Sequence, residues 1–254
     1  MRKLMATCAA SLFILAFAGT ASAITYGEPD GNRHPEVGAL LAPHAYSDGT
    51  WTTCSGTLIS ANVFLTAAHC DWDLERMAVT FASTYVPGVS TVYWGDWHAD
   101  PLYSGAQGDP NDLAVVVLDN APGITPAELP AAGWLSSLPR DQTFTSVGYG
   151  AQAVTIDHGP SFSYADIRYM ATSDTLFAIN KAWLRISMNP ALGDGGTCYG
   201  DSGGPNFLGA GASETNIVAA TTITGDYLCR ATNVVYRLDT DSARSFLGQY
   251  VTLP

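Results

Sequence analysis

Short apolar runs, rather than long helical patterns, dominate the chain after its first two dozen residues. The runs are rich in Val, Ile, Leu and Thr, and Gly, Pro, Asn and Asp separate them as turn-forming residues. The clearest runs are residues 37–41, 57–59, 63–66, 113–118, 143–147, 217–223 and 234–238. Many short strands with frequent turn signals predict an all-β protein built of sandwiches or barrels.

Two segments depart from this pattern. Residues 121–140 contain four prolines and read as a connector between two β units. Near the C-terminus the apolar positions change to helical spacing after Asp239-Thr240-Asp241, which resembles a capped helix start. The apolar side chains of this segment are Ala243, Phe246, Leu247, Tyr250 and Val251. This spacing predicts an amphipathic terminal helix.

The first 23 residues have the pattern of a secretory signal peptide. Arg2 and Lys3 form a positive start, residues 12–18 form a short apolar core, and Ala21-Ser22-Ala23 forms a small-residue cleavage site. The apolar run is too short to span a membrane. We therefore expect a secreted protein whose mature chain begins at Ile24.

Charge and cysteine content narrow the class of protein. Removal of the leader, whose only charged residues are Arg2 and Lys3, changes the net charge from −12 to −14. Nucleic-acid binding is therefore not expected, because phosphate contacts need clustered Lys and Arg. No later segment is apolar enough to span a membrane. Cys8 leaves with the leader, and the four remaining cysteines predict two disulfides, with three pairings open on spacing alone.

Three motifs carry candidate chemistry. LTAAHC at 65–70, NDLAVVVL at 111–118 and CYGDSGGP at 198–205 contribute His69, Asp112 and Ser202. A serine hydroxyl is a weak nucleophile and needs a base such as a neutral imidazole. The imidazole needs a carboxylate that holds its tautomer and stabilises its cation. The backbone N–H groups of Gly200 and Ser202 are candidate donors to a developing oxyanion.

The glycine-flanked serine also fits the G-x-S-x-G nucleophile elbow of α/β-hydrolases. In that fold the catalytic histidine follows the serine along the chain, whereas the last histidine here is His158. Pro205 also follows the motif closely, where a helix is required. The esterase interpretation therefore lacks a base.

In this order, the three motifs resemble those of the chymotrypsin/trypsin-like serine peptidases, in a secreted member of the bacterial type. The resemblance implies two six-stranded antiparallel β-barrels with the active site between them and a C-terminal α-helix. It places one barrel in residues 24–130, with His69 and Asp112, and the other in residues 131–254, with Ser202. It also suggests the pairings Cys54–Cys70 and Cys198–Cys229.

The family resemblance gives the mature N-terminus a role. In active members, an apolar first residue inserts its α-amino group beside the aspartate that precedes the nucleophile. These residues are Ile24 and Asp201 here, so signal-peptide cleavage would itself activate the protein. A buried carboxylate requires such a partner. The alternative is that Ile24 only begins a strand and a propeptide boundary lies elsewhere.

The substrate pocket follows from the same resemblance. Its implied residues are Gly196, Thr197, Tyr199, Thr222, Ile223, Thr224 and Val234. Gly196 stands at the pocket floor, where an aspartate would select basic side chains. Thr224 and Val234 are larger than the usual glycines, so we expect small or medium apolar P1 residues. Asp226 keeps open the alternative of a basic preference. The segment 222–224 is expected to pair with the substrate backbone.

The sequence thus predicts a serine endopeptidase that acts on protein or peptide substrates through an acyl-enzyme. The alternative is a catalytically silent member of the same fold that only binds a partner. No cofactor or metal ion is expected, because His34, His44, His98 and His158 show no metal-ligand spacing. We expect a monomer that contacts neither nucleic acid nor membrane.

Overall fold

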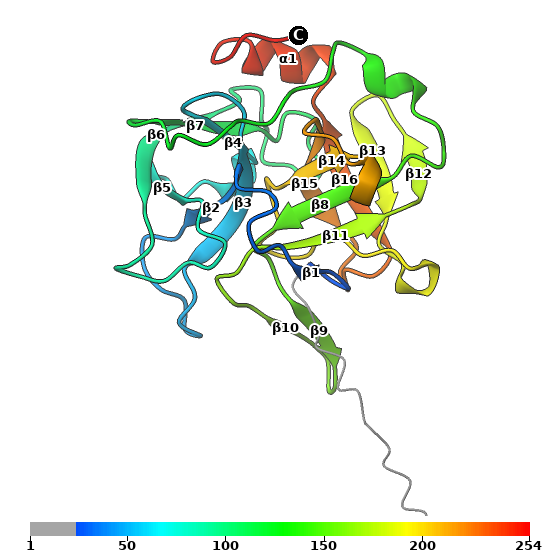
Figure 1. Ribbon diagram of the computed structural model, residues 1–254, viewed down its shortest axis with the longest axis horizontal. Helices are drawn as coiled ribbons and strands as arrows, with labels where there is room; N and C mark the ends of the chain where they lie inside the picture. Colours follow the sequence, from blue (N-terminus) through cyan, green and yellow to red (C-terminus); the bar gives the residue numbers. More distant parts are fainter. Residues whose placement is uncertain (1–23) are drawn as a thin grey trace, which may run out of the picture.

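The computed structural model describes residues 24–254, so the predicted signal peptide lies outside the described residues. The structure consists mainly of strands in two units that lie side by side, with one α-helix at the C-terminus (Figure 1). This confirms the chymotrypsin-like, all-β prediction. In residues 24–254, no helix is both long and apolar enough to cross a membrane.

The first unit is a closed six-stranded barrel. Its strands are β2 (Val37–Leu41), β3 (Thr52–Leu58), β4 (Val63–Thr66), β5 (Arg76–Thr80), β6 (Tyr93–Ala99) and β7 (Ala114–Leu118), in the order β2-β3-β4-β7-β6-β5. All neighbouring strands are antiparallel. Leu40, Phe64, Met77 and Val116 fill its interior.

The second unit is an eight-stranded antiparallel sheet, in the order β1-β11-β8-β14-β15-β16-β13-β12. Its strands are β1 (Glu28–Pro29), β8 (Phe144–Gly148), β11 (Tyr169–Ser173), β12 (Leu176–Ile179), β13 (Trp183–Ser187), β14 (Pro205–Leu208), β15 (Val218–Gly225) and β16 (Thr232–Arg237). This sheet is curled and has two more strands than the six predicted. The short β1 joins it from the N-terminal segment, and the chain passes from β11 to β12 over only two residues.

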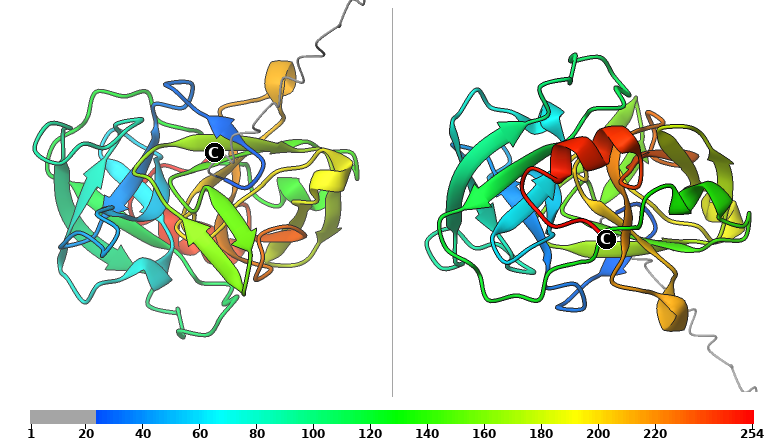
Figure 2. Two further views of the ribbon diagram at one scale, coloured as in Figure 1. Left: turned by 90° about the horizontal axis from the view of Figure 1, so that it is seen from below. Right: turned by 90° about the horizontal axis from the view of Figure 1, so that it is seen from above.

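The remaining elements decorate these two units. A hairpin of β9 (Ala153–Ile156) and β10 (Pro160–Ser163) projects from the body (Figure 1). The terminal helix α1 (Asp241–Leu247) begins at Thr240, whose side chain accepts from the Ala243 N–H at 3.2 Å. The helix lies across the top of the molecule (Figure 2), and the following Tyr250 ring packs on His98 of β6. The predicted helix is therefore present, but it ends at Leu247, so Tyr250 and Val251, which were predicted to lie on it, fall in the turn beyond it.

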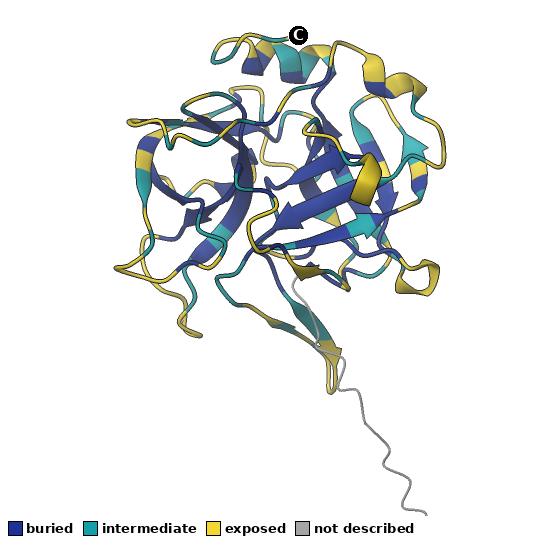
Figure 3. Ribbon diagram, viewed as in Figure 1, coloured by how far each residue is buried: buried dark blue, intermediate teal, exposed yellow. Residues whose placement is uncertain are grey.

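One apolar cluster joins the two units. It combines Leu65 and Val115 of the barrel with Val147, Phe207 and Tyr236 of the second sheet. The strands are buried where the units meet, while the connecting loops are exposed (Figure 3). The connector of residues 121–140 carries no long strand and leads to β8. The predicted division into 24–130 and 131–254 stays a prediction, and β1 pairs across it.

Candidate active site

Two neighbouring barrel strands bring His69 and Asp112 together. Thr66, at the end of β4, pairs with Ala114, at the start of β7. His69 lies in the 3₁₀ turn Ala68–Cys70 that follows β4, and Asp112 lies just before β7. The Asp112 carboxylate accepts from the His69 backbone N–H at 2.9 Å and contacts the His69 Nδ1 at 2.7 Å. These two contacts orient the imidazole. The His69 side chain stays 32% exposed, whereas Asp112 is buried.

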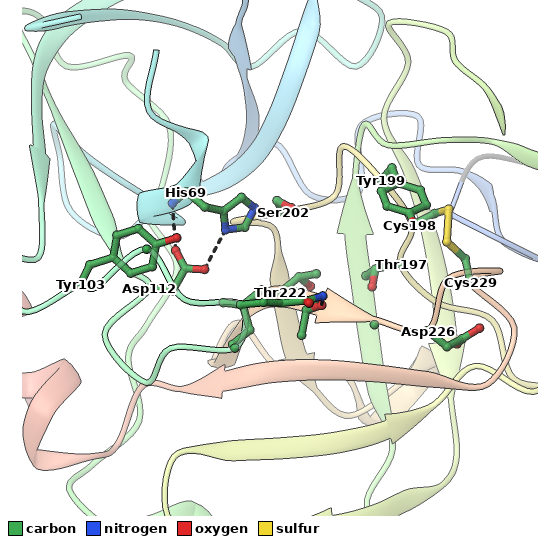
Figure 4. A pocket seen from close by; sticks show the side chains of 16 residues that line it. His69, Tyr103, Asp112, Thr197, Cys198, Tyr199, Ser202, Thr222, Asp226 and Cys229 are labelled. Carbon is green, nitrogen blue, oxygen red and sulfur yellow. Dashed lines mark hydrogen bonds and ion pairs between the residues drawn. A yellow bond between two sulfur atoms is a disulfide. The ribbon is translucent and has the colours of Figure 1, made fainter. Parts of the chain in front are cut away.

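Ser202 reaches the same cleft from the second unit (Figure 4). Its loop is held by Ser55 of β3, whose N–H donates to the Ser202 carbonyl at 2.8 Å and whose hydroxyl donates to the Gly200 carbonyl at 3.0 Å. A hydrogen bond from the Ser202 hydroxyl to the imidazole is not among the contacts of residues 24–254. Such bonds often tighten only when substrate binds.

The candidate oxyanion donors are the backbone N–H groups of Gly200 and Ser202. Within the described chain, neither group donates to a protein acceptor. Gly200 has a φ of +94°, a conformation that residues with a side chain rarely adopt. The loop can therefore present both donors to a substrate oxygen.

Asp201 points inward from the same loop and is completely buried. It accepts from the N–H groups of Gly150 at 2.8 Å and Cys198 at 2.8 Å. Burial raises its pKa to about 7, although these two backbone donors lower it. A Cβ at Gly148 would lie 2.1 Å from one Asp201 oxygen, so only glycine fits there. Among residues 24–254, no cation forms an ion pair with Asp201.

Ile24, the predicted partner of Asp201, is also fully buried. The next residue, Thr25, anchors it: its carbonyl accepts from the Gly196 N–H at 3.0 Å, and its hydroxyl donates to the Cys229 carbonyl at 2.8 Å. In the unprocessed chain the Ile24 nitrogen belongs to a peptide bond and carries no charge. The pairing of Ile24 with Asp201 therefore stays a prediction for the processed chain.

The two disulfides are confirmed as Cys54–Cys70 and Cys198–Cys229. The first connects β3 to the turn that carries His69, and the second connects the Ser202 loop to the chain between β15 and β16. Cys54, His69 and Cys70 also place three metal-ligand atoms within 4.8 Å of one another. Both sulfurs are bonded to each other, so they are not thiolate ligands.

The cleft beside the triad has a volume of about 360 Å³. Five predicted pocket residues line it, namely Thr197, Tyr199, Thr222, Ile223 and Thr224. Gly196 and Val234 do not. Val234 instead pairs with Thr224 in the β15–β16 ladder.

The side chain of Met188 explains why Gly196 does not line the cleft. A Cβ at Gly196 would lie 2.3 Å from the Met188 Cγ, and one at Gly225, which does line the cleft, would lie 3.5 Å from the Met188 Cε. This buried methionine therefore packs against Gly196 and lies beneath the cleft, next to the lining residues Gly225 and Thr197. It was not among the residues predicted from sequence, because an isolated apolar residue after a strand has no distinctive signal.

Asp226 also lines the cleft. Partial burial would raise its pKa, but backbone N–H donors outweigh burial and hold the pKa below its usual value. These donors include Ala231 at 2.7 Å and Thr232 at 2.8 Å. Its charge is thus already stabilised by its own loop, and Asp226 does not need a basic substrate side chain as partner.

Comparisons with known proteins identify the family of the chain. A protein-family model described as Trypsin matches residues 34–243, which is most of the chain. The thrombin-like enzyme acutin of Deinagkistrodon acutus is 28% identical over 180 residues, which cover 63% of this chain and 71% of that protein. The bacterial type expected from the sequence is not tested by this relative.

Proposed function

Because the chain belongs to the trypsin family of serine proteases, we propose that it is a secreted serine endopeptidase with Ser202 as nucleophile. The observation that carries this proposal is the pair of contacts from Asp112 to His69, at 2.9 and 2.7 Å, beside Ser202. These contacts orient one imidazole nitrogen toward the carboxylate and leave the other for the serine. A fold used only for binding has no need of this orientation.

The proposed reaction follows the serine peptidase template. Ser202 Oγ attacks the scissile carbonyl while His69 accepts its proton, and His69 then donates that proton to the leaving amine. A water molecule, activated by His69, hydrolyses the acyl-enzyme. Asp112 stabilises the imidazolium in both halves of the reaction. The N–H groups of Gly200 and Ser202 stabilise the oxyanion, and each donor contributes roughly 2.7–4 kcal/mol.

We propose that removal of residues 1–23 activates the enzyme. The new α-amino group of Ile24 would supply the cation that the buried Asp201 does not have within the described chain. Desolvation of an unpaired carboxylate is costly, so this pair would stabilise the loop that carries Gly200 and Ser202. The buried position of Ile24 beside the Gly196 segment supports the proposal.

The substrate side chain that enters the cleft is proposed to be small or medium and apolar. Met188 lies beneath the cleft, and Thr197 and Thr224 line it. The position that would select basic residues is Gly196, which has no carboxylate. Asp226 is already satisfied by backbone donors.

Intact mass spectrometry of the secreted protein, before and after a serine-directed fluorophosphonate, tests these proposals. We expect a mass that begins at Ile24 with two disulfides, and one stoichiometric adduct that Ser202→Ala abolishes. A correct start without an adduct would favour a silent binding protein. A different start would contradict activation by signal-peptide cleavage.

A further inference from the structure

A loop from the barrel unit crosses the candidate cleft and contacts the second unit. This crossing loop, residues 103–109, follows β6, and Tyr103, Gly105, Gln107 and Gly108 line the cleft. The Gln107 side-chain Nε2 donates to the Thr224 hydroxyl at 3.1 Å. The two residues are 117 positions apart in the sequence, so this hydrogen bond joins the two units across the cleft.

The base of the crossing loop is held firmly while its tip is open. The buried Asp109 accepts from the N–H groups of Ser104 at 3.0 Å and Asn111 at 2.8 Å. Gly105 and Gly108, which flank Gln107, have φ values of +79° and +74°, and no atom of the described residues lies within 4 Å of a Cβ placed at either. The tip therefore has room to move about a fixed base, and the bond to Thr224 is what holds Gln107 over the cleft.

Thr224 lies on the strand edge where an extended substrate would bind. The pairing of β14 with β15 ends at Pro205 and Thr221. The N–H and carbonyl of Thr222 bond to Gly204 and Gly203 of the nucleophile loop. Beyond Thr222, the edge of β15 on that side has no partner strand within the described chain. A peptide that adds to this edge advances about 3.3 Å per residue away from Ser202.

We propose that Gln107 is a specificity-determining residue that selects substrates by the length of the segment before the scissile bond. This inference rests on the proposed peptidase function. A substrate with one residue before the scissile bond binds near Ser202 and leaves the Gln107–Thr224 bond intact. A substrate with four such residues runs along β15 past Thr224 and must break it. The enzyme is thereby biased toward short or flexible acyl segments.

Kinetics with matched substrates test the proposal. Two p-nitroanilides with the same P1 residue, one with a single acyl-side residue and one with four, are hydrolysed by the processed wild type, Gln107→Met and Gln107→Gly. Met keeps the bulk of the side chain without its donor, and Gly removes both. In both Gln107 variants, we expect the ratio of kcat/KM for the long substrate to that for the short one to rise about three- to tenfold relative to wild type. This is the change expected when one hydrogen bond no longer has to be broken.

The controls separate this inference from the proposed function. Gln249→Met changes an exposed glutamine beyond α1 and is expected to leave the ratio unchanged. Fluorophosphonate titration reports whether the protein is a serine hydrolase at all, independently of Gln107. Calorimetric binding of the two peptides, as amides, to Ser202→Ala with and without Gln107→Met measures the same ratio without turnover. An unchanged or reduced ratio in both Gln107 variants would overturn the proposal.

Discussion

Two carboxylates are buried in the described structure to almost the same extent, but they differ in what compensates their charge. Asp30 is 2% exposed and Asp201 is fully buried. Burial raises the pKa of each group, yet ion pairs with His34 and Arg168 bring that of Asp30 down to about 2, whereas that of Asp201 rises to about 7. Asp30 is a buried carboxylate whose charge is stabilised by cationic partners. Asp201 is a buried carboxylate at which a cation is still needed.

The Asp30 region is a structural joint between the two units. The Arg168 Nε donates to Asp30 at 2.8 Å, and its Nη1 donates to the Val37 carbonyl of β2 at 2.7 Å. On the other side of Asp30, His34 bonds Glu214 through Nε2 at 2.7 Å. The joint connects the N-terminal segment, the barrel and the second sheet, and each charge in it has an opposite partner. Among residues 24–254, Asp201 has only backbone donors, which fits a site that is completed after cleavage.

Breaking the Asp30 joint is expected to have the largest effect. Arg168→Met removes the cation from a fully buried pair, and of the charged partners of Asp30 in residues 24–254 it leaves His34. The free energy of unfolding should fall by about 3–5 kcal/mol. Urea unfolding measures this loss, and kcat/KM per titrated active site should stay close to wild type.

The matched control is Arg185→Met, which changes an exposed arginine on β13. It should alter stability by less than about 0.5 kcal/mol. Equal effects of the two substitutions would mean that Arg168 stabilises the fold no more than a surface cation does.

Changing the Asp201 region is expected to affect catalysis more than stability. One extra alanine before Ile24 in the processed protein would move the α-amino group away from Asp201. The loss of a correctly placed Gly200 donor then lowers kcat/KM by about 10²–10³-fold. Kinetics and unfolding on the same preparation measure both quantities. Unchanged kcat/KM in the extended protein would refute activation through Ile24, and Ile24→Val, which keeps the chain length, is the control.

The pH dependence of stability tests the Asp30 joint further, with a somewhat smaller expected effect on the free energy of unfolding. Bonds to Asp30 and Glu214 overcome the effect of burial and raise the pKa of His34 from 6.5 to about 9. Because the pKa is raised, the ion pairs of protonated His34 stabilise the fold fully below pH 6.5. This stabilisation is lost as pH rises through about 9. The shift corresponds to about 3 kcal/mol. Thermal unfolding of wild type and His34→Gln should therefore differ at low pH and converge at high pH, whereas a pH-independent difference would contradict the ion pair.

Much of the fold followed from local pattern. Residues 37–41 and 63–66 are strands β2 and β4 with the predicted bounds. β6 is not among the clearest runs, because one face is exposed and its apolar run is broken by Gly95 and Asp96. Gly95 is required there, since a Cβ would lie 2.5 Å from the Val117 carbonyl oxygen of β7. That constraint comes from the neighbouring strand and has no trace in the local sequence.

The residues of the candidate site also fall into two groups, those that a local motif predicted and those that only a distant contact revealed. His69, Asp112 and Ser202 stand in short motifs, because catalytic geometry demands particular residues next to particular turns. Ser55 and Gln107 have no motif. Each acts through hydrogen bonds with the second unit, more than 100 positions away: Ser55 with the Ser202 and Gly200 carbonyls, and Gln107 with the Thr224 hydroxyl.

By itself, therefore, the sequence determined the β-rich class, the residues of the proposed triad and the presence of paired cysteines, because strand periodicity and turn chemistry are local. Only the tertiary structure decided that Met188 lies beneath the cleft, that Arg168 and His34 compensate Asp30, and that Asp201 has no cation in residues 24–254. These features depend on strand register and on how two units meet. The register sets which distant side chains come within bonding distance, and between strands far apart in the sequence it is fixed when their buried faces pack together.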